Sequence, residues 1–265
     1  MASLFETIEK GLESWGFDLC QPFEIEDYNE NVSGIYKIPS MGRENTLAVL
    51  VGNSRNIWEH FIERLAEDES LYKEDNPLDA YTKMAIQSVV AKLHVRTCVY
   101  YTCDSRTVPF LDYQLIAEIS GMCIRSYYSK MCYHHKYGHW IGLRAVIVLD
   151  HTYIYNLSSK HMVDFEICKK CDLKYGEMLD ELCKDKEMMN RYRDPATWRS
   201  WLALRTICTH NQYNYTYEEA CYHYSKNRRV LESEVQRYRQ GTFKPNYDWL
   251  EAYNRDPEHY RVNDF

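Results

Sequence analysis

The segment from Trp140 to Asp150 places the strongest constraint on the fold. It is apolar almost throughout, and its core, Ala145 to Leu149, has no polar side chain. A strand of this kind is buried on both faces, so it needs neighbouring strands and a covering layer on each side. A second apolar run, Thr46 to Val51, predicts another buried strand. We therefore expect a sheet with the 140–150 segment at its centre.

The remaining segments predict helices around this sheet. Apolar residues recur at helical spacing over residues 2–16, 54–66, 77–92, 110–125, 174–191, part of 198–207 and 216–239, and strand-like patterns cover 94–102 and 131–134. Helices and strands are mixed without a strict alternation, which favours an α+β fold with a mixed or antiparallel sheet flanked by helices. We expect one domain over residues 1–240, irregular or edge structure near 152–170, and a tail over 241–265 that wraps the surface or is partly mobile.

The charge balance excludes several classes of partner. Lys and Arg number 32 and Asp and Glu number 39, a net charge of −7. Proteins that bind nucleic acid or anionic lipid usually present a basic face, so we expect neither partner. No apolar run is long enough to span a membrane, and the charged, amphipathic N-terminus lacks the apolar core of a signal peptide. These features predict a cytoplasmic protein whose ten cysteines are reduced.

Standard nucleotide and hydrolase motifs are absent from the sequence: there is no Walker A loop, no G-x-G-x-x-G after a strand, no H-E-x-x-H and no G-x-S-x-G. Cys168-Lys-Lys-Cys171 is a single CxxC motif without a second pair nearby, so it is either a redox pair or a chance spacing. The histidines of the 132–144 segment, His134, His135 and His139, do not converge easily because neighbours on a strand point to opposite faces. We expect no metal site there.

Arginines among apolar residues point instead to an anion. Arg144 interrupts the apolar strand, and a charge in such a place needs an anionic partner, either an internal carboxylate or the carboxylate of a ligand. The 198–205 and 227–231 segments supply further arginines, and the planar guanidinium fork suits carboxylates. The chain also has 24 tyrosines, which suit either half-buried packing or the walls of a large amphipathic ligand site.

In order and spacing, four segments resemble the family of cblC-type cobalamin-processing chaperones, the MMACHC family. These segments are Phe23 to Glu30, the stretch TLAVLVGNSRNIWEHFIERLA from Thr46, Leu93 to Gly121, and Cys132 to Leu149. The Trp-Arg-x-Trp and Tyr-x-x-Glu-Glu stretches near the C-terminus match more loosely. The resemblance covers roughly residues 15–235.

The resemblance implies a fold and a reaction. The fold would be an α+β sandwich similar to flavin-dependent nitroreductases, with a C-terminal cap. The chain would bind cobalamin with its lower base detached and remove the upper axial ligand. For alkylcobalamins the glutathione thiolate attacks the alkyl carbon, and for cyanocobalamin the cyanide leaves reductively, with electrons from reduced FMN or FAD or from NADPH. The product would pass to an adaptor protein of the cblD type.

The resemblance also implies binding residues, but no catalytic side chain and no metal held by the protein. The glutathione-binding arginines fall on Arg144, on Arg205 (or its neighbour Leu204) and on Arg229 (or Arg228). The cobalamin contacts fall on Tyr100, Leu111, Asp112, Tyr113, Gln114, Tyr127, Tyr128, Ser129 and Leu143. Two departures stand out: Glu118 replaces a family histidine, and the loop after Ser129 is shorter.

Two other functions fit the same resemblance. The first is a non-catalytic carrier that binds cobalamin and passes it on. The second is a flavin reductase on the same fold, although a flavin phosphate would need a basic cradle near the N-terminal helices, and the sequence shows none there.

Overall fold

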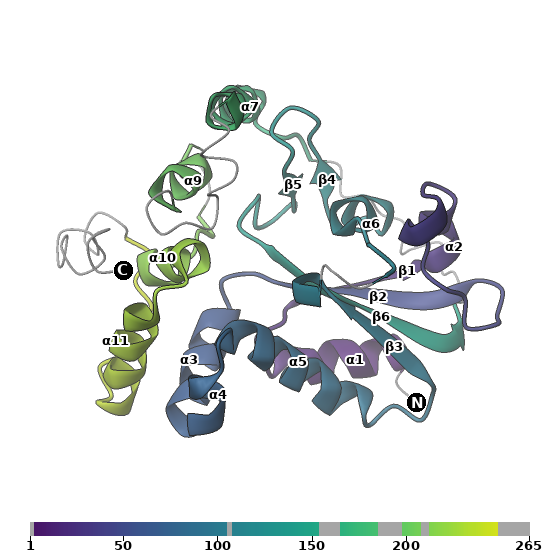
Figure 1. The fold of residues 1–265 in the computed structure, drawn as a ribbon, viewed down its shortest axis with the longest axis horizontal. Helices are drawn as coiled ribbons and strands as arrows, with labels where there is room; N and C mark the ends of the chain where they lie inside the picture. The colour runs from purple at the N-terminus through teal and green to yellow at the C-terminus, as the bar shows by residue number, and fades with distance from the viewer. Residues whose placement is uncertain (1–2, 105–107, 154–164, 185–197, 208–211, 249–265) are drawn as a thin grey trace.

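A computed structural model describes residues 3–104, 108–153, 165–184, 198–207 and 212–248. Its centre is a four-stranded antiparallel sheet in the order β1, β2, β6, β3 (Figure 1). The strands are β1 (Leu19–Glu24), β2 (Thr46–Asn53), β3 (Thr97–Tyr101) and β6 (Gly142–Thr152). The predicted α+β fold is confirmed in its antiparallel form, and the apolar 140–150 segment is a central strand, as expected.

Helices cover both faces of the sheet (Figure 1). One face carries α1 (Leu4–Glu13), α3 (Ile57–Glu67) and α5 (Pro77–Val90), with the short α4 (Glu69–Lys73) between the last two. The other face carries α2 (Ile25–Asn29) and α6 (Tyr113–Ile119), beside a hairpin of β4 (Ile124–Arg125) and β5 (Cys132–Tyr133). Two 3₁₀ turns, Gly34–Tyr36 and Thr102–Asp104, complete this part of the chain.

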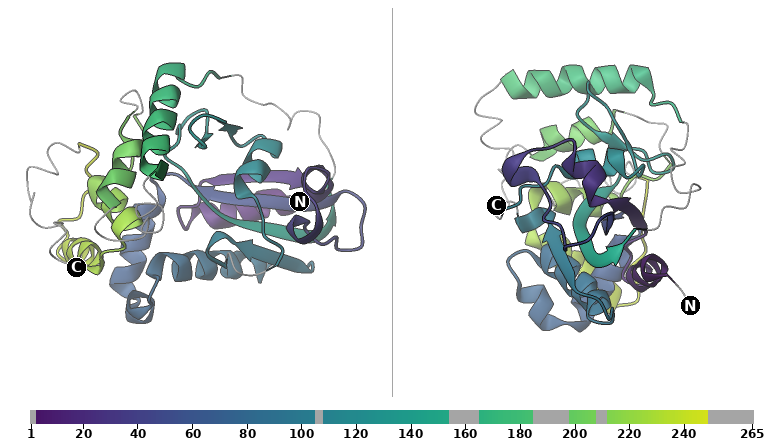
Figure 2. Two further views of the ribbon diagram at one scale, coloured as in Figure 1. Left: turned by 45° about the horizontal axis from the view of Figure 1, so that its top comes forward. Right: turned by 90° about the vertical axis from the view of Figure 1, so that its right-hand side faces the viewer.

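Four helices follow one another along one side of the sheet (Figures 1 and 2). They are α7 (Lys169–Lys184), α9 (Trp198–Arg205), α10 (Tyr217–Ser225) and α11 (Arg228–Arg239). The last of these packs on α3, where the Tyr238 hydroxyl donates to Oε1 of Glu63 at 2.7 Å. None of the helices in the described ranges is both long and apolar enough to cross a membrane.

The strand period of two divides the core into two clusters. Val49 and Ile147 lie in the cluster beneath α1, α3 and α5, whereas Leu50 and Val148 lie in the cluster beneath α2 and α6. All four side chains are fully buried. Because successive side chains of a strand point to opposite faces, an all-apolar strand can supply both clusters at once.

A β-bulge breaks this alternation at Arg144. Val51 pairs with Ala145, but Gly52 pairs with Leu143, so β6 has one extra residue at that point. Because of the extra residue, Leu143 packs against the core cluster beneath α2 and α6. Arg144 lies on the other side of the strand, where its Nε donates to Oδ1 of Asn53 at 2.6 Å. Bulges re-aim side chains in this way.

The glycine next to the bulge, Gly142, lies close to two side chains of the site. A Cβ at position 142 would lie 2.9 Å from Oδ1 of Asn53 and 3.0 Å from the Arg144 guanidinium. Any side chain at Gly142 would therefore push on the Arg144–Asn53 contact.

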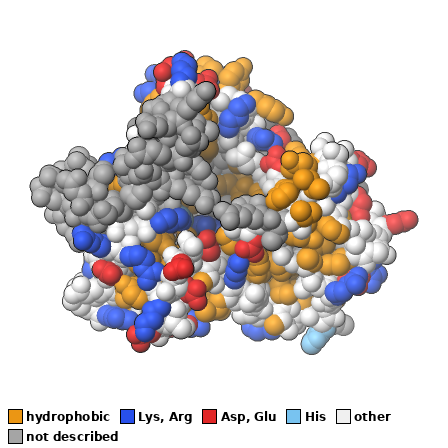
Figure 3. Space-filling view, in the orientation of Figure 1, with side chains coloured by type: hydrophobic (Ala, Val, Ile, Leu, Met, Phe, Trp, Pro, Cys, Tyr) orange, Lys and Arg blue, Asp and Glu red, His pale blue; other side chains and the backbone are white. Residues whose placement is uncertain are grey.

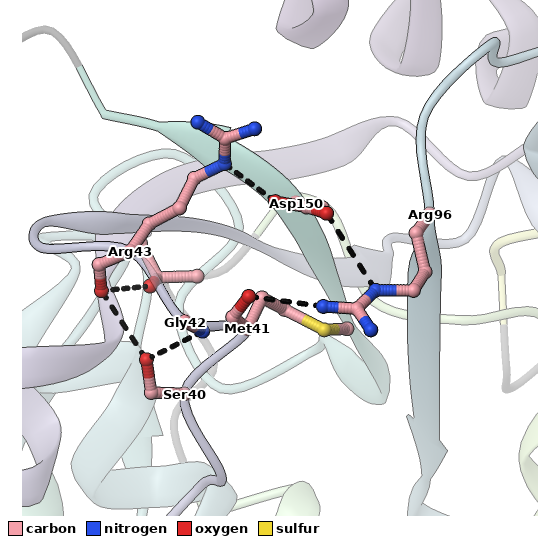
Figure 4. A network of polar contacts seen from close by, with 7 residues as sticks. Ser40, Met41, Gly42, Arg43, Arg96 and Asp150 are labelled. Carbon is pink, nitrogen blue, oxygen red and sulfur yellow. Dashed lines mark hydrogen bonds and ion pairs between the residues drawn. The ribbon is translucent and has the colours of Figure 1, made fainter.

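The far end of β6 is held by ion pairs (Figure 4). Asp150 accepts a hydrogen bond from Nε of Arg43 and lies 3.6 Å from Nε of Arg96. Arg96 also donates to the carbonyl of Met41 at 2.9 Å. The Arg43 hydrogen bond lowers the pKa of Asp150, and together these contacts tie the 40–43 loop across the end of the sheet.

Two sequence expectations need correction, and one strand was not predicted. The 216–239 segment is two helices, because Lys226 takes a left-handed backbone and the Asn227 side chain caps α11 by accepting from the Arg229 N–H at 2.9 Å. The helix expected over 110–125 is shorter, since Asp112 caps it at its start and it ends at Ile119. Strand β1 was missed because Pro22 interrupts its pattern, which an edge strand tolerates.

The predicted strands over 94–102 and 131–134 and the helix over 174–191 are present with different limits. Part of the last, residues 185–191, lies outside the described residues, as do 154–164 of the expected irregular segment and 249–265 of the expected tail. The described start of that tail lies against the domain, where the Arg55 guanidinium stands 3.9 Å from the centre of the Tyr247 ring.

The left-handed linker at Lys226 yields a stability prediction. Its φ of 56° is disfavoured for every residue except glycine and, to a lesser degree, asparagine. Lys226→Gly is expected to be more stable than Lys226→Ala by about 1 kcal/mol, because both variants lose the same side-chain contacts and differ mainly at the backbone. Urea unfolding of the two variants measures this difference, and equal midpoints would contradict the assigned conformation.

Candidate functional site

A buried polar cluster lies where the β6 bulge meets α9 and α10. We call it the arginine cluster, and it comprises Arg144, Arg205, Tyr215, Glu219, His223 and Tyr224. The charges of both arginines act on the pKa values of Tyr215 and His223, and the rings of Tyr215 and His223 lie 5.2 Å apart. The structure therefore brings together two of the three arginines that the resemblance singled out.

Arg205 is fixed at the end of α9 by contacts on several sides. Its Nε donates to the Tyr224 hydroxyl at 2.7 Å, and its guanidinium also donates to the carbonyl of His139 and lies 5.9 Å from the Trp140 ring. The His139 ring in turn contacts the Arg205 carbonyl at 2.9 Å. Burial and the Arg205 charge lower the pKa of His139 to about 3, so this histidine is neutral at physiological pH.

Glu219 lies at the base of the arginine cluster and is fully buried. Neither of its carboxyl oxygens has a hydrogen-bond partner among the described residues, and Oε1 lies 3.7 Å from Nε2 of His223. Burial raises the pKa of Glu219 well above its usual value and lowers that of His223 well below. Both shifts favour the uncharged forms, so burial opposes an ion pair between the two groups.

This arrangement decides between two explanations for Arg144. An internal salt bridge would place a carboxylate on its guanidinium, but in the described part of the chain no carboxylate lies within ion-pair distance of Arg144 or Arg205. The partner of Arg144 is the neutral amide oxygen of Asn53. Within the described ranges the two guanidinium groups thus have no carboxylate partner, which suits an anionic ligand.

The structure also separates the neighbouring alternatives for the other two arginines. Leu204 is a core residue, 1% exposed, so Arg205 is the polar group available at that position. Arg228 donates to the carbonyls of Tyr72 and Glu74 and lies 5.0 Å from the Tyr72 ring, which gives it a structural role between α11 and α4. Arg229, in the first turn of α11, has an exposed side chain.

The expected cobalamin residues gather mainly on the opposite face of the sheet. Tyr100 of β3, Leu143 of β6 and Tyr113 of α6 all pack against the cluster beneath α2 and α6, as does Leu111. Burial raises the pKa of Tyr113 above its usual value, and Tyr100 is among the groups near enough to add to that shift.

Asp112 and Gln114 hold the start of α6 in place. Asp112 caps the helix by accepting from the N–H groups of Gln114 and Leu115, and its Oδ2 lies 3.2 Å from the guanidinium of Arg125. Gln114 uses its side-chain amide to donate to the carbonyl of Lys130 at 3.0 Å. The helix start is therefore tied to the turn that follows the tyrosine run.

The tyrosine run forms an exposed aromatic edge. Tyr127 and Tyr128 are 73% and 67% exposed, whereas Ser129 is fully buried. Exposed aromatic side chains of this size mark binding surfaces more often than structural ones. Figure 3 shows that this face of the molecule is hollowed and that hydrophobic side chains border the hollow.

Sequence reasoning missed the residues that support this aromatic edge. Ser126 accepts from the Tyr128 N–H at 3.1 Å and donates to Asp172 of α7 at 2.7 Å, and the Tyr133 hydroxyl donates to the same carboxylate at 3.2 Å. A Cβ at Gly176 would lie 3.0 Å from the Tyr128 carbonyl oxygen, so α7 packs directly on the turn. In the sequence, the signal available for this close packing was Gly176, a glycine in the interior of a predicted helix.

The histidine-rich turn does not assemble a metal site from the described residues. His134 and His135 stack at 4.2 Å between ring centres, and no group of three or more His, Cys, Asp or Glu side chains in the described ranges could hold an ion.

Comparison with known proteins identifies the family. A profile of the methylmalonic aciduria and homocystinuria type C family, MMACHC, matches residues 16–229. The chain belongs to this family. The match includes Arg144, Arg205, Arg229 and the expected cobalamin residues, and it extends from just before β1 to the first turn of α11.

Two curated relatives of this MMACHC-family chain carry the name cyanocobalamin reductase / alkylcobalamin dealkylase. The Bos taurus protein is 24% identical and the Mus musculus protein 23% identical, each over 182 residues. Each alignment covers 62% of this chain and 63% of the relative, so the chain spans less than two thirds of those proteins.

A solved structure shares the fold. The crystal structure of a C. elegans B12-trafficking protein CblC, described as a human MMACHC homologue, aligns with a TM-score of 0.64 at 12% identity. The alignment covers 86% of this chain and 94% of the other.

The buried carboxyl of Glu219 predicts a pH-dependent stability. In the unfolded chain this group ionises near its usual pKa of 4.5, but the raised pKa keeps the folded carboxyl protonated, so the folded state binds more protons above pH 4.5. The free energy of unfolding contributed by Glu219 is therefore present at low pH and falls by about 1.4 kcal/mol per pH unit up to the raised pKa. Glu219→Gln is expected to remove this slope.

Urea unfolding of wild type and Glu219→Gln between pH 5 and pH 8 measures that slope. Both proteins contain His223, so the difference between their slopes reports on Glu219. Glu232→Gln, at an exposed carboxylate of α11, is the control and should keep the wild-type slope. Identical slopes for wild type and Glu219→Gln would contradict a neutral buried carboxyl.

Proposed function

We propose that the chain binds cobalamin and removes its upper axial ligand, with glutathione as the thiol for alkylcobalamins. The observation that carries the proposal is the pair of half-buried guanidinium groups, Arg144 and Arg205, that no carboxylate of the described chain neutralises. Membership of the MMACHC family and the names of the two curated relatives support the choice of cobalamin as substrate.

In this proposal the arginine cluster is the thiol side of the site. Glutathione carries two carboxylates, which suit the guanidinium forks of Arg144 and Arg205, with Arg229 as a third contact. Burial favours the uncharged forms of Glu219 and His223, which leaves the positive charge of the arginines available to a ligand. Cationic surroundings lower the pKa of a thiol and so favour the thiolate, which is the nucleophile.

The cobalamin side is the opposite face of β6, beneath α6. Tyr100, Leu111, Tyr113 and Leu143 offer apolar and hydroxyl contacts there, and Tyr127 and Tyr128 extend the surface outward. Asp112, Gln114 and Ser129 complete the set of proposed contacts. The two sides adjoin at the start of β6, since Leu143 and Arg144 are neighbours in the chain that lie on opposite sides of the sheet.

For an alkylcobalamin substrate, the thiolate sulfur forms a bond to the alkyl carbon while the carbon–cobalt bond breaks. The electron pair of that bond stays with cobalt, which gives cob(I)alamin and a thioether. The cofactor-like substrate supplies the leaving group, so the protein's contribution is to orient the thiolate and to keep it ionised. This division of labour agrees with a site that needs no catalytic acid or base.

Several finer features remain part of the proposal. Cyanocobalamin would lose cyanide reductively, with electrons from FMN, FAD or NADPH, on a sandwich fold similar to flavin-dependent nitroreductases. The chain would work in the cytoplasm and pass its product to an adaptor of the cblD type. The resemblance to the family motivates each of these features.

Arg144 provides the direct test of the thiol side. Arg144→Ala is expected to lower kcat/KM for glutathione-dependent dealkylation of methylcobalamin by about 10- to 150-fold, because a hydrogen bond to a charged group contributes about 1.5–3 kcal/mol. The Kd for methylcobalamin should not change. Arg144→Lys keeps the charge without the fork and should give a smaller loss.

Arg96→Ala is the matched control, since Arg96 binds Asp150 and the Met41 carbonyl at the other end of the sheet. It should keep wild-type rates. The outcome that contradicts the assignment is equal loss in both alanine variants, or dealkylation by Arg144→Ala at the wild-type rate. Wild-type protein that binds cobalamin without dealkylating it would instead be a carrier.

The aromatic edge tests the cobalamin side. Because Tyr127 and Tyr128 are mostly exposed, replacing either by alanine should change the free energy of unfolding by less than about 0.5 kcal/mol. Loss of an aromatic contact of roughly 1 kcal/mol or more should nevertheless raise the Kd for methylcobalamin about fivefold. An absorbance titration measures this Kd, and unchanged affinity in the double variant would remove these residues from the site.

A further inference from the structure

Two cysteines meet at the start of α7. The carbonyl of Cys168 accepts the Asp172 N–H at 2.9 Å, which makes Cys168 the residue on which the helix begins. The Cys168-Lys-Lys-Cys171 spacing at the start of a helix places the two cysteines within one helical turn of each other.

The two thiols differ in access. Cys168 is exposed, whereas Cys171 is partly buried and its sulfur lies 4.0 Å from the carbonyl of Ile207, just beyond α9. The Cys168 sulfur is therefore accessible to a reactant from solvent, and the Cys171 sulfur is less accessible. An attacking thiol and a resolving thiol need this asymmetry.

Both cysteines line a cavity of about 260 Å³ between the start of α7 and the histidine-rich turn. His134, His135 and Lys136 line the opposite wall, with Tyr213 beside them, and the Lys136 ammonium lies 5.6 Å from the Tyr213 ring. Lys169 and Lys170 are exposed between the two cysteines in the sequence. The cavity thus has room for a small molecule. Burial lowers the pKa of His134 to about 4, so this imidazole is neutral, and the lining also includes Glu166; the cationic groups are therefore Lys136 in the lining and Lys169 and Lys170 beside it, which suit a ligand with carboxylates.

Cys168 also differs electrostatically from the other cysteines. Hydrogen bonds from Cys171 lower its pKa, whereas burial raises the pKa of Cys20, Cys132 and Cys221 to about 12. A thiolate is the reactive form of cysteine, so we expect Cys168 to react faster than Cys20, Cys132 and Cys221. The nine described cysteines form no disulfide, and the absence of a third ligand among the described residues argues against a metal at this pair.

We propose that Cys168 and Cys171 form a thiol–disulfide exchange site for disulfides of small, carboxylate-bearing thiols. The Cys168 thiolate attacks one sulfur of the disulfide, which forms a mixed disulfide and releases one thiolate. The Cys171 thiolate then attacks the Cys168 sulfur, which closes the Cys168–Cys171 disulfide and releases the second thiolate. Two electrons pass from the protein dithiol to the small disulfide, which becomes two thiols. This inference does not depend on cobalamin binding.

The test uses the reduced full-length chain and glutathione disulfide as the probe, without cobalamin. Samples are quenched with an alkylating reagent over time, and the modified peptides are quantified by mass spectrometry. Wild type should form the Cys168–Cys171 disulfide and release two glutathiones for each glutathione disulfide consumed. Cys171→Ser should stop at a glutathione adduct on Cys168. Cys168→Ser should slow reaction at position 171 by about tenfold or more.

Cys183, an exposed cysteine on the same helix, is the internal control. At pH 7 it should react more slowly than Cys168, because no second cysteine lies within one helical turn of it in the sequence. The proposal is overturned if wild type never forms the 168–171 linkage, or if Cys183 is modified as fast as Cys168. The wild-type chain alone shows whether the Cys168–Cys171 disulfide forms, so the proposal can be tested even if a variant fails to fold.

Discussion

The charge of Arg144, which has no carboxylate partner in the described part of the chain, is the feature on which the rest of the site depends, because it lies in an otherwise apolar central strand. A guanidinium in such a place costs free energy unless something nearby stabilises it. The bulge in β6 turns Arg144 out of the apolar alternation, Gly142 leaves room beside it, and Asn53 gives it one neutral oxygen. The carboxyl that could have neutralised it, Glu219, is fully buried, and burial raises its pKa and so favours its uncharged form.

The same bulge relates the two faces of the sheet. On one side α9 and α10 close over the arginine cluster, and their apolar residues extend the core beneath α3 and α5. On the other side α6 and the tyrosine turn stand over Tyr100 and Leu143, with α7 fixing the turn through Asp172. A large ligand on the α6 face and a small anionic one on the α10 face would therefore meet at residues 143–144, on a rigid strand rather than on a loop.

The sequence was sufficient for the features that depend on local pattern. It predicted the central strand from an apolar run, α3 and α5 from helical spacing, and Arg144 from a charge in the wrong environment. It could not predict features set by tertiary contacts. Strand β1 could not be predicted because Pro22 interrupts its pattern, and one segment alone does not show that a strand lies at the edge of a sheet. The lysine at position 226 likewise gives no indication of the break between α10 and α11. The burial of Glu219, and the contact that lowers the pKa of Cys168, follow only from the folded arrangement.

An anaerobic absorbance titration of the wild-type chain with methylcobalamin, followed by glutathione, tests the central claim most directly. The account predicts a shift to the spectrum of cobalamin with its lower base detached, and then conversion to cob(I)alamin once the thiol is added. A shift without conversion would contradict the proposed reaction while leaving a binding site. Absence of any shift would contradict the proposed substrate, and the likeness to the MMACHC family would then be one of fold and ancestry without this activity.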